Sequence, residues 1–132
     1  MGYEVKDADL IKTKALPAAA GSVQTAGIYI KPGGDFLGPA ELLISAPALN
    51  TTQLPDTETM TYIVEESDDD STYNTLHDNA LVQTGAGGAG AAAATVKVGL
   101  PTDVKKYVRV KATGSTSIGD CSGASVTMSL LM

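Results

Sequence analysis

The sequence predicts an all-β fold, an antiparallel β-sandwich of the jelly-roll kind. Apolar and polar side chains alternate with a period of two in almost every ordered-looking segment, which is the pattern of a strand with one buried face. The 14 glycines and 6 prolines divide these segments into short pieces, and no stretch carries a long amphipathic helical pattern. Many short alternating strands between turn residues are typical of sandwiches and jelly rolls.

The 132 residues suit one sandwich domain, which at this size buries roughly two-thirds of its unfolded surface. We expect this domain to span residues 22–132. We expect residues 1–21 to form an extended N-terminal arm that lies over the domain or over a neighbour. Pro17 limits any helix in this arm to a short turn. The alternative is that the segment packs on the chain's own sheet or frays.

The first predicted strands follow directly after the arm. Residues 22–31 end in isoleucines that alternate with tyrosine and lysine, and Pro32-Gly33-Gly34 predicts a turn after them. Residues 40–46 form a second strand, which a proline closes, and the polar residues 50–57 form a loop. Residues 59–66 (TMTYIVEE) are dense in β-branched and aromatic side chains, which predicts a strand.

The middle of the chain is polar and rich in small residues. Residues 67–79 (SDDDSTYNTLHDN) are too polar for a core and predict a surface excursion, with one helical turn near residues 73–76. A short strand is expected at residues 81–84. The stretch GAGGAGAAAA, residues 85–94, has no side chain that could anchor it, so we expect a flexible loop tip.

The last third of the chain alternates most regularly. Val96 and Val98 flank a lysine in a short strand. Residues 107–113 direct valine and alanine to one face and tyrosine, arginine, lysine and threonine to the other. Residues 125–130 place valine, methionine and leucine inward and serine and threonine outward. These patterns predict three more strands.

Composition excludes several classes of function. The net charge is -6, with 15 acidic and 9 basic residues, which does not suit a surface that neutralises phosphates, so we expect no nucleic-acid partner. No apolar run approaches the roughly 20 residues of a membrane span, and the start lacks the apolar core of a signal peptide. We therefore expect no membrane contact and synthesis in a cytoplasm. The chain has few aromatic residues, Phe36 and five tyrosines, so its core is thin, which favours stabilisation in a homo-oligomer.

The residue types that carry chemistry are scarce, so we expect no enzyme, no catalytic residue and no cofactor. His77 is the single histidine and Cys121 the single cysteine, which rules out a His-rich metal site or an intrachain disulfide. Asp68, Asp69 and Asp70 are weak candidates for a calcium site, because adjacent carboxylates attract a hard cation, but their spacing does not fit an EF-hand. A solvated acidic turn is the other interpretation.

Four segments also carry a resemblance to a known family. They are residues 41–49 (ELLISAPAL), residues 61–76 (TYIVEESDDDSTYNTL), the Gly/Ala stretch, and residues 100–131, where a Leu-Pro step precedes a Tyr-Val-Arg-Val strand and an apolar C-terminal strand. In this order the segments resemble the small jelly-roll capsid decoration, or cement, proteins of tailed bacteriophages. The similarity extends over residues 22–131.

The resemblance implies a protein that binds the outer surface of a phage head at junctions between major capsid subunits and stabilises the shell. It further implies the major capsid protein as partner, a trimer ahead of a dimer, synthesis in the bacterial host cytoplasm, and a final place on the outer surface of the virion. The large apolar residues of the arm would then contact neighbours: Tyr3, Leu10, Ile11 and Leu16. The alternative is a calcium-assisted carbohydrate-binding or receptor-binding β-sandwich module, in which exposed Tyr29 and Tyr107 could stack on sugars.

Overall fold

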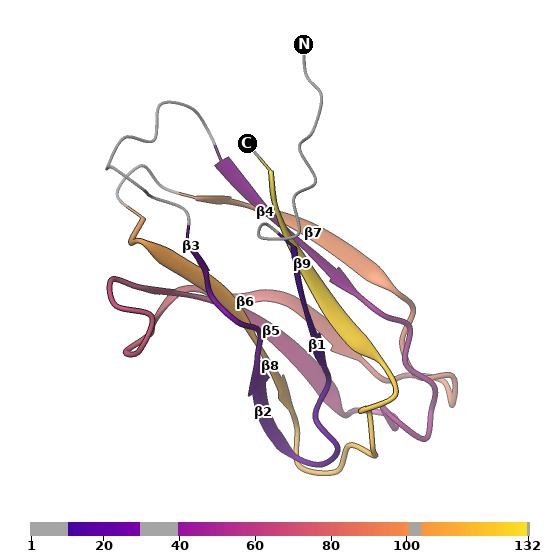
Figure 1. The fold of residues 1–132 in the computed structure, drawn as a ribbon. Coiled ribbons are helices and arrows are strands. Elements are labelled where there is room, and N and C mark those ends of the chain that lie inside the picture. The colour runs from indigo at the N-terminus through magenta and orange to yellow at the C-terminus, as the bar shows by residue number, and fades with distance from the viewer. Residues whose placement is uncertain (1–10, 30–39, 101–103, 132) are drawn as a thin grey trace.

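Two antiparallel sheets form the fold in a computed structural model that describes residues 11–29, 40–100 and 104–131 (Figure 1). The described residues contain no helix, and therefore no helix that is long and apolar enough to cross a membrane. The strands are β1 (Ile11–Ala15), β2 (Gly21–Gln24), β3 (Ile28–Tyr29), β4 (Ala40–Ala46), β5 (Thr59–Ser67), β6 (Asn74–Thr84), β7 (Ala94–Leu100), β8 (Tyr107–Gly114) and β9 (Ser125–Leu131).

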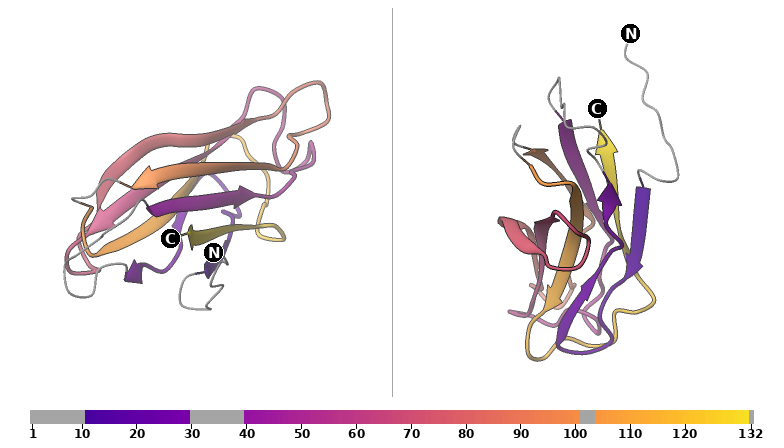
Figure 2. Two further views of the ribbon diagram at one scale, coloured as in Figure 1. Left: turned by 90° about the horizontal axis from the view of Figure 1, so that it is seen from above. Right: turned by 60° about the vertical axis from the view of Figure 1, so that its left-hand side comes forward.

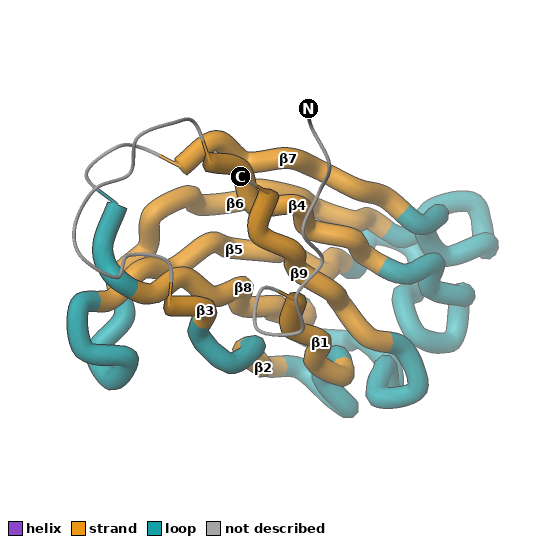
Figure 3. The backbone as a smooth tube through the Cα atoms, turned by 45° about the horizontal axis from the view of Figure 1, so that its top comes forward, coloured by secondary structure: helices purple, strands orange, loops and turns teal. Residues whose placement is uncertain are grey.

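The strand order is that of a jelly roll. Sheet A has the order β1-β9-β4-β7, and sheet B has the order β2-β8-β5-β6, with β3 also paired to β8. Because β2 and β3 pair with successive parts of β8, they act as one interrupted strand. The chain therefore crosses from one sheet to the other at every step except within this strand and between β5 and β6. Figure 2 shows the two layers from two directions, and in Figure 3 the loops gather at the two ends of the strands. The expected antiparallel, jelly-roll-like β-sandwich is confirmed.

The core lies between the sheets, and the period of two predicted it correctly. The central strands β4, β5, β8 and β9 alternate buried and less buried positions along their length. Their buried side chains are Leu42, Ile44, Ala46, Met60, Tyr62, Val64, Val108, Val110, Ala112, Val126, Met128 and Leu130. These side chains are the sets that the alternation grouped on one face of each segment, and for Val126, Met128 and Leu130 that face was predicted to be the inward one.

The second half of the proposed arm belongs to the sandwich. Residues 11–15 are strand β1, which pairs with β9 from Ile11 opposite Ser129 to Ala15 opposite Ser125. After it, the Leu16 amide donates to the Ala124 carbonyl at 2.9 Å, and the Leu16 side chain is 2% exposed. For this part of the arm the alternative therefore holds, since it packs on the chain's own sheet.

Residues 73–76 form no helical turn, contrary to the sequence prediction. Residues 74–84 instead make one long edge strand, β6, because the free edge of β5 offers hydrogen-bond partners that outweigh the local turn tendency. The pairing shifts register around Leu76 and again at residues 78–80, where Asn79 has a φ of 51°. These irregularities are β-bulges, which bend an edge strand and hide the simple alternation of side chains.

The Gly/Ala stretch, residues 85–94, was expected to be a flexible loop tip because it has no large side chains. Hydrogen bonds of its backbone anchor it instead. Leu49 and Ala91 exchange two backbone hydrogen bonds of 2.9 and 2.8 Å, and the Gly88 amide donates to Asp56 Oδ1 at 2.8 Å. Gly90 has a φ of 70°, and a Cβ there would collide with the Leu49 carbonyl. Glycine at this position therefore permits the close approach of two loops.

Candidate binding surface

A pair of tyrosines lies on the outer face of sheet B. Tyr29 on β3 is directly opposite Tyr107 on β8, and their ring centroids are 5.1 Å apart at an interplanar angle of 37°. Tyr29 is 48% exposed and, with Val82 of β6, is one of two large apolar side chains exposed in the described ranges. An exposed tyrosine packed against a second, half-buried tyrosine offers an apolar surface that carries hydroxyl groups.

An ion-paired cluster lies next to this tyrosine pair. The Arg109 guanidinium lies 3.8 Å from the centroid of the Tyr73 ring, and its Nε donates to Glu65 Oε1 at 2.7 Å. Lys111 Nζ approaches the other oxygen of Glu65 at 3.5 Å. Glu65 is only 6% exposed, although it projects from the outer face of the sheet. The side chains around it therefore form a rigid cover in which each charge has a partner.

The first two aspartates of the acidic loop are held by the chain itself. Asp68 Oδ2 accepts from Lys105 Nζ at 3.2 Å. Asp69 Oδ1 accepts from the amides of Thr72 and Ser71, both at 2.9 Å, and these bonds lower the pKa of its carboxyl group. A carboxylate whose lone pairs already accept several N–H bonds shapes the turn and has less capacity for a cation.

The third aspartate is bonded within the loop, next to the backbone between β2 and β3. Asp70, which has a φ of 58°, accepts a hydrogen bond from the Tyr73 hydroxyl. Both side chains approach Gly27 so closely that a Cβ there would collide with them. The loop therefore covers the interruption between β2 and β3. The three aspartates have three different partners, and no group of three metal-ligating side chains is found in the described part of the chain.

Neither His77 nor Cys121 belongs to a group of three metal-ligating side chains among the described residues. His77 is exposed on the edge strand β6 and not in a loop as the sequence suggested. Cys121 is buried, and burial raises the pKa of its thiol, which keeps it protonated. Its Sγ lies 3.5 Å from the Gln53 carbonyl and 3.6 Å from the Gly119 carbonyl.

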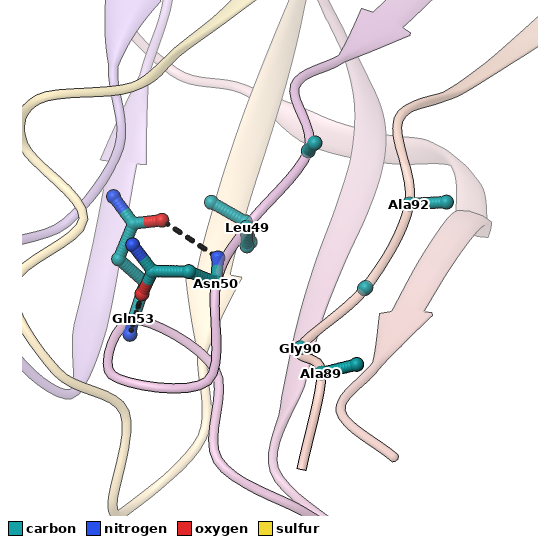
Figure 4. A pocket seen from close by; sticks show the side chains of 8 residues that line it. Leu49, Asn50, Gln53, Ala89, Gly90 and Ala92 are labelled. Atoms are coloured by element: carbon teal, nitrogen blue, oxygen red, sulfur yellow. Dashed lines mark hydrogen bonds between the residues drawn. The ribbon is translucent and has the colours of Figure 1, made fainter. Parts of the chain in front are cut away.

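An open hollow of about 550 Å³ lies between the turn after β4 and the Gly/Ala stretch (Figure 4). The side-chain carbonyl oxygens of Asn50 and Gln53 are already bonded within the turn. Asn50 Oδ1 accepts from the amides of Thr52 and Gln53, and Gln53 Oε1 accepts from the Asn50 amide, each at 2.9 Å. Small alanines line much of the remainder. The hollow therefore offers few free polar groups to orient a small ligand.

The outer face of sheet A, here called the A-face, is the second exposed surface. Its outward positions are Ile11, Thr13, Ala15, Glu41, Leu43, Ser45, Thr95, Lys97, Gly99, Ser125, Thr127, Ser129 and Leu131. Hydroxyl side chains dominate it, and only Glu41 and Lys97 are charged. Strand pairing places Ile11, Ser129 and Leu43 in one row, with Leu131 diagonal to Leu43.

The four residues of the arm that were expected to contact neighbours lie in different places. Ile11 lies on it, whereas Leu16 is buried in the core and cannot reach a neighbour. Tyr3 and Leu10 lie outside the described residues. The sequence analysis missed Leu43 and Leu131 as surface residues. The available signal was a leucine at an outward position of each alternating strand, where polar residues are the norm.

No family model and no curated protein matches this sequence. Among solved structures, the PBSX exported protein XepA is similar with a TM-score of 0.52 and 18% identity, over 90% of this chain and 34% of that chain. The VP2 subviral particle of infectious bursal disease virus is similar with a TM-score of 0.50 and 9% identity, over 98% of this chain and 32% of that chain. The xylan-binding module CBM15 gives a TM-score of 0.43 and 10% identity, over 98% of this chain and 95% of that chain.

The chain thus spans about a third of the length of XepA and of VP2. At these identities the likeness shows the fold alone, an all-β sandwich.

Proposed function

We propose that this chain is a capsid decoration protein, which binds the outer surface of a tailed-phage head at junctions between major capsid subunits and stabilises the shell. One observation carries the proposal. A single sandwich has two opposed outer surfaces, the A-face, with three half-buried aliphatic residues among short hydroxyl side chains, and the tyrosine pair of sheet B. Two surfaces on opposite sides allow one small protein to contact more than one neighbour.

The hydrogen bonding of the interior supports a binding role, because no buried polar side chain of the described residues needs a ligand as its partner. No buried side-chain nitrogen or oxygen in the described ranges lacks a hydrogen-bond partner. A preorganised sandwich loses little conformational entropy when it binds. A ligand that binds only the assembled shell stabilises that shell by its own binding free energy, and many copies multiply the effect.

The assembly state and the location follow from the same proposal. The repeated subunit clusters of a shell favour a symmetric homo-oligomer, with a trimer ahead of a dimer. The chain would be made in the bacterial host cytoplasm and would end on the outer surface of the virion, with the major capsid protein as its partner. The acidic composition supports a face turned away from packaged DNA.

The test uses mature heads of a tailed phage that encodes the chain, prepared without it. Purified chain should co-sediment with these heads in a fixed ratio and raise the temperature at which they release DNA. Immature shells assembled from the same capsid protein are the control, and they should bind less. Failure to bind mature heads at micromolar concentration would contradict the proposal.

The tyrosine pair favours a second candidate, a carbohydrate-binding module. Tyr29 presents an exposed ring face next to Tyr107, and such faces stack on sugar rings. Titration with soluble xylan and other plant and bacterial glycans should then give binding that Tyr29→Ala removes. Because Asp68, Asp69 and Asp70 each have a different partner, we expect calcium not to raise the melting temperature. A clear rise would support the calcium-assisted form of this candidate.

A further inference from the structure

The edges of the two sheets differ in how well they are protected against a further strand. On the edge strand β1, Lys12 and Lys14 lie opposite the buried Met128 and Val126, so two charges point to the inner side of the sheet. Two register shifts distort the edge strand β6, and the edge formed by β2 and β3 is interrupted at Gly27, which the acidic loop approaches. Inward charges, bulges and interruptions all hinder the addition of another strand.

The remaining edge is strand β7, which has none of these features. It pairs with β4 over all seven of its residues without a register shift, and it pairs with no other strand among the described residues. Figure 3 shows it along the upper rim of the fold. Val96, Val98 and Leu100 share its inner side, and Val96 and Leu100 are only half-buried. A regular, unpaired edge with β-branched side chains is a template for a further strand.

The residues of β7 are suited to pairing with a second copy of the same strand. In an antiparallel pair that continues the sheet, inward residues lie opposite inward residues, so a two-fold axis passes through a residue of the strand. An axis at Lys97, the single charged residue of β7, would place lysine opposite lysine. An axis at Val98 places Lys97 opposite the partner's Gly99 and Val96 opposite the partner's Leu100. Gly99 is exposed, and a Cβ there would meet no atom within 4 Å, so the lysine has room.

The first half of β7 is less open than the second half. Gln83 of β6 donates through Nε2 to the Ala92 carbonyl at 3.0 Å, two residues before β7 begins. This bond holds the edge of sheet B against the start of β7. An axis at Val96 would bring the second copy toward this contact, whereas an axis at Val98 moves it away. The observations therefore favour pairing between residues 96–100 of the two copies.

We propose that two copies of this chain pair through β7, antiparallel about a two-fold axis at Val98, so that their four-stranded sheets A form one continuous eight-stranded sheet. Backbone hydrogen bonds between the two strands supply most of the affinity, and the added strand covers the half-buried Val96 and Leu100 from the side. This inference goes beyond the decoration function and does not depend on it. Both outer faces of the sandwich stay free, and the assembly is a dimer.

A charge swap across the pairing tests the proposal. Gly99→Lys places a lysine opposite the partner's Lys97 on both sides of the axis, and the open space at Gly99 lets the single chain accept it. Adding Lys97→Glu to this variant turns both like-charged pairs into pairs of opposite charge. Thr13→Lys is the matched control, because it adds the same charge at an exposed outward position of β1, the opposite edge of sheet A. Sedimentation equilibrium measures dimerisation, and thermal melting confirms that each variant is folded.

A strand pair buries less area than most stable dimers, so the unaltered chain should dimerise with a dissociation constant of about 10 to 100 µM. Gly99→Lys should weaken dimerisation about fivefold, since like charges then lie directly opposite, and the double variant should restore at least the original affinity. Thr13→Lys should change it by less than about twofold.

Three results would overturn the pairing through β7. The first is a chain that stays monomeric at about 1 mM, where a dimer of the expected affinity would predominate. The second is a dimer that Gly99→Lys weakens no more than Thr13→Lys does. The third is a double variant that dimerises as weakly as Gly99→Lys alone. Binding to mature heads is measured separately, so each of these results leaves the decoration function intact.

Discussion

The buried pair Tyr62 and Gln83 provides a sharp test of how the two sheets are held together. The Tyr62 hydroxyl donates to Gln83 Oε1 at 2.7 Å. Gln83 Nε2 in turn donates to the carbonyls of Pro47 at 2.8 Å and Ala92 at 3.0 Å, which lie at the ends of strands in sheet A. Tyr62 is 0% exposed and Gln83 is 4% exposed, so water cannot replace a lost partner.

Tyr62→Phe removes one donor and leaves the Gln83 carbonyl oxygen buried without a hydrogen bond. Such a loss costs about 2 kcal/mol, within the range for an unsatisfied buried acceptor. With an unfolding entropy of about 2.1 cal/mol/K per residue, a domain of this size should melt about 7 °C lower. Urea unfolding followed by circular dichroism measures the free energy, and calorimetry measures the melting temperature.

A double-mutant cycle shows whether the effect comes from this hydrogen bond. Gln83→Met leaves the Tyr62 hydroxyl and two carbonyls without partners, so it should cost more than Tyr62→Phe. In the Gln83→Met background, Tyr62→Phe should be neutral or stabilising, because it removes an unpaired hydroxyl. A loss below about 0.5 kcal/mol for Tyr62→Phe alone, or simple additivity in the cycle, would refute the reasoning.

Alkaline pH gives an independent check on the same residue. Burial raises the pKa of Tyr62 above its ordinary value of 10.0, so above pH 10 the unfolded chain loses this proton while the folded chain retains it. Stability is therefore full below pH 10 and declines as the pH rises toward the folded pKa, by about 1.4 kcal/mol per pH unit. The stability gap between the unaltered chain and Tyr62→Phe should shrink by about 1.4 kcal/mol between pH 8 and pH 11.

Three further predictions concern the loops and the outer face of sheet B. Gly90→Ala should lower the free energy of unfolding by about 2 to 3 kcal/mol, whereas Gly87→Ala, with a φ of 64° but open space around it, should cost only about 1 kcal/mol; equal losses in urea unfolding would contradict the close approach at Gly90. The lowered pKa of Asp69 contributes stability that is full above its ordinary value of 3.8 and is lost as the pH falls through the lower folded pKa, so the destabilisation by Asp69→Asn should be largest at pH 7 and should shrink as the pH falls below 3.8; a loss independent of pH would exclude this linkage. Glu65→Gln should cost about 2 kcal/mol in chemical denaturation because Arg109 loses its charged partner; a neutral result would show that the ion pair adds no net stability.

The central strands were predictable because burial acts directly on local sequence. In residues 59–66 and 107–113 every second side chain enters the core, so the alternation of residue types records the two faces of the sheet. The same logic located the strand at 125–130 and the outward orientation of Tyr107. Each of these strands has a neighbour on both sides, so its inner face is completely buried.

Two of the edge strands, β1 and the first part of β6, escaped prediction for the opposite physical reason. Residues 74–79 of β6 are mostly exposed, and bulges interrupt their register, so no alternation remains to be detected. Strand β1 has five residues and contacts a neighbour on one side only. In both strands, hydrogen bonds to a distant partner determine the structure more than the local residue pattern does.

Both candidate surfaces depend on such distant partners. Exposure of Tyr29 and Tyr107 could be anticipated one residue at a time, but their contact exists only because β3 pairs with β8. In the same way, Ile11, Leu43 and Leu131 share one face only through the pairing of β1, β9 and β4. The acidic loop also could not be predicted from its sequence. Its three aspartates are neighbours in the chain, but the folded loop gives each of them a different hydrogen-bond partner.

By itself the sequence determined the class of the fold, the inward faces of the central strands and the acidic, chemically sparse character of the chain, because each of these is set by residue type and short-range spacing. Only the tertiary structure decided which strands became neighbours and which apolar residues met on a common face. Those outcomes depend on the balance between the entropy lost when long loops close and the free energy gained when one shared core is buried. Both quantities depend on the whole chain and cannot be assigned to a single segment.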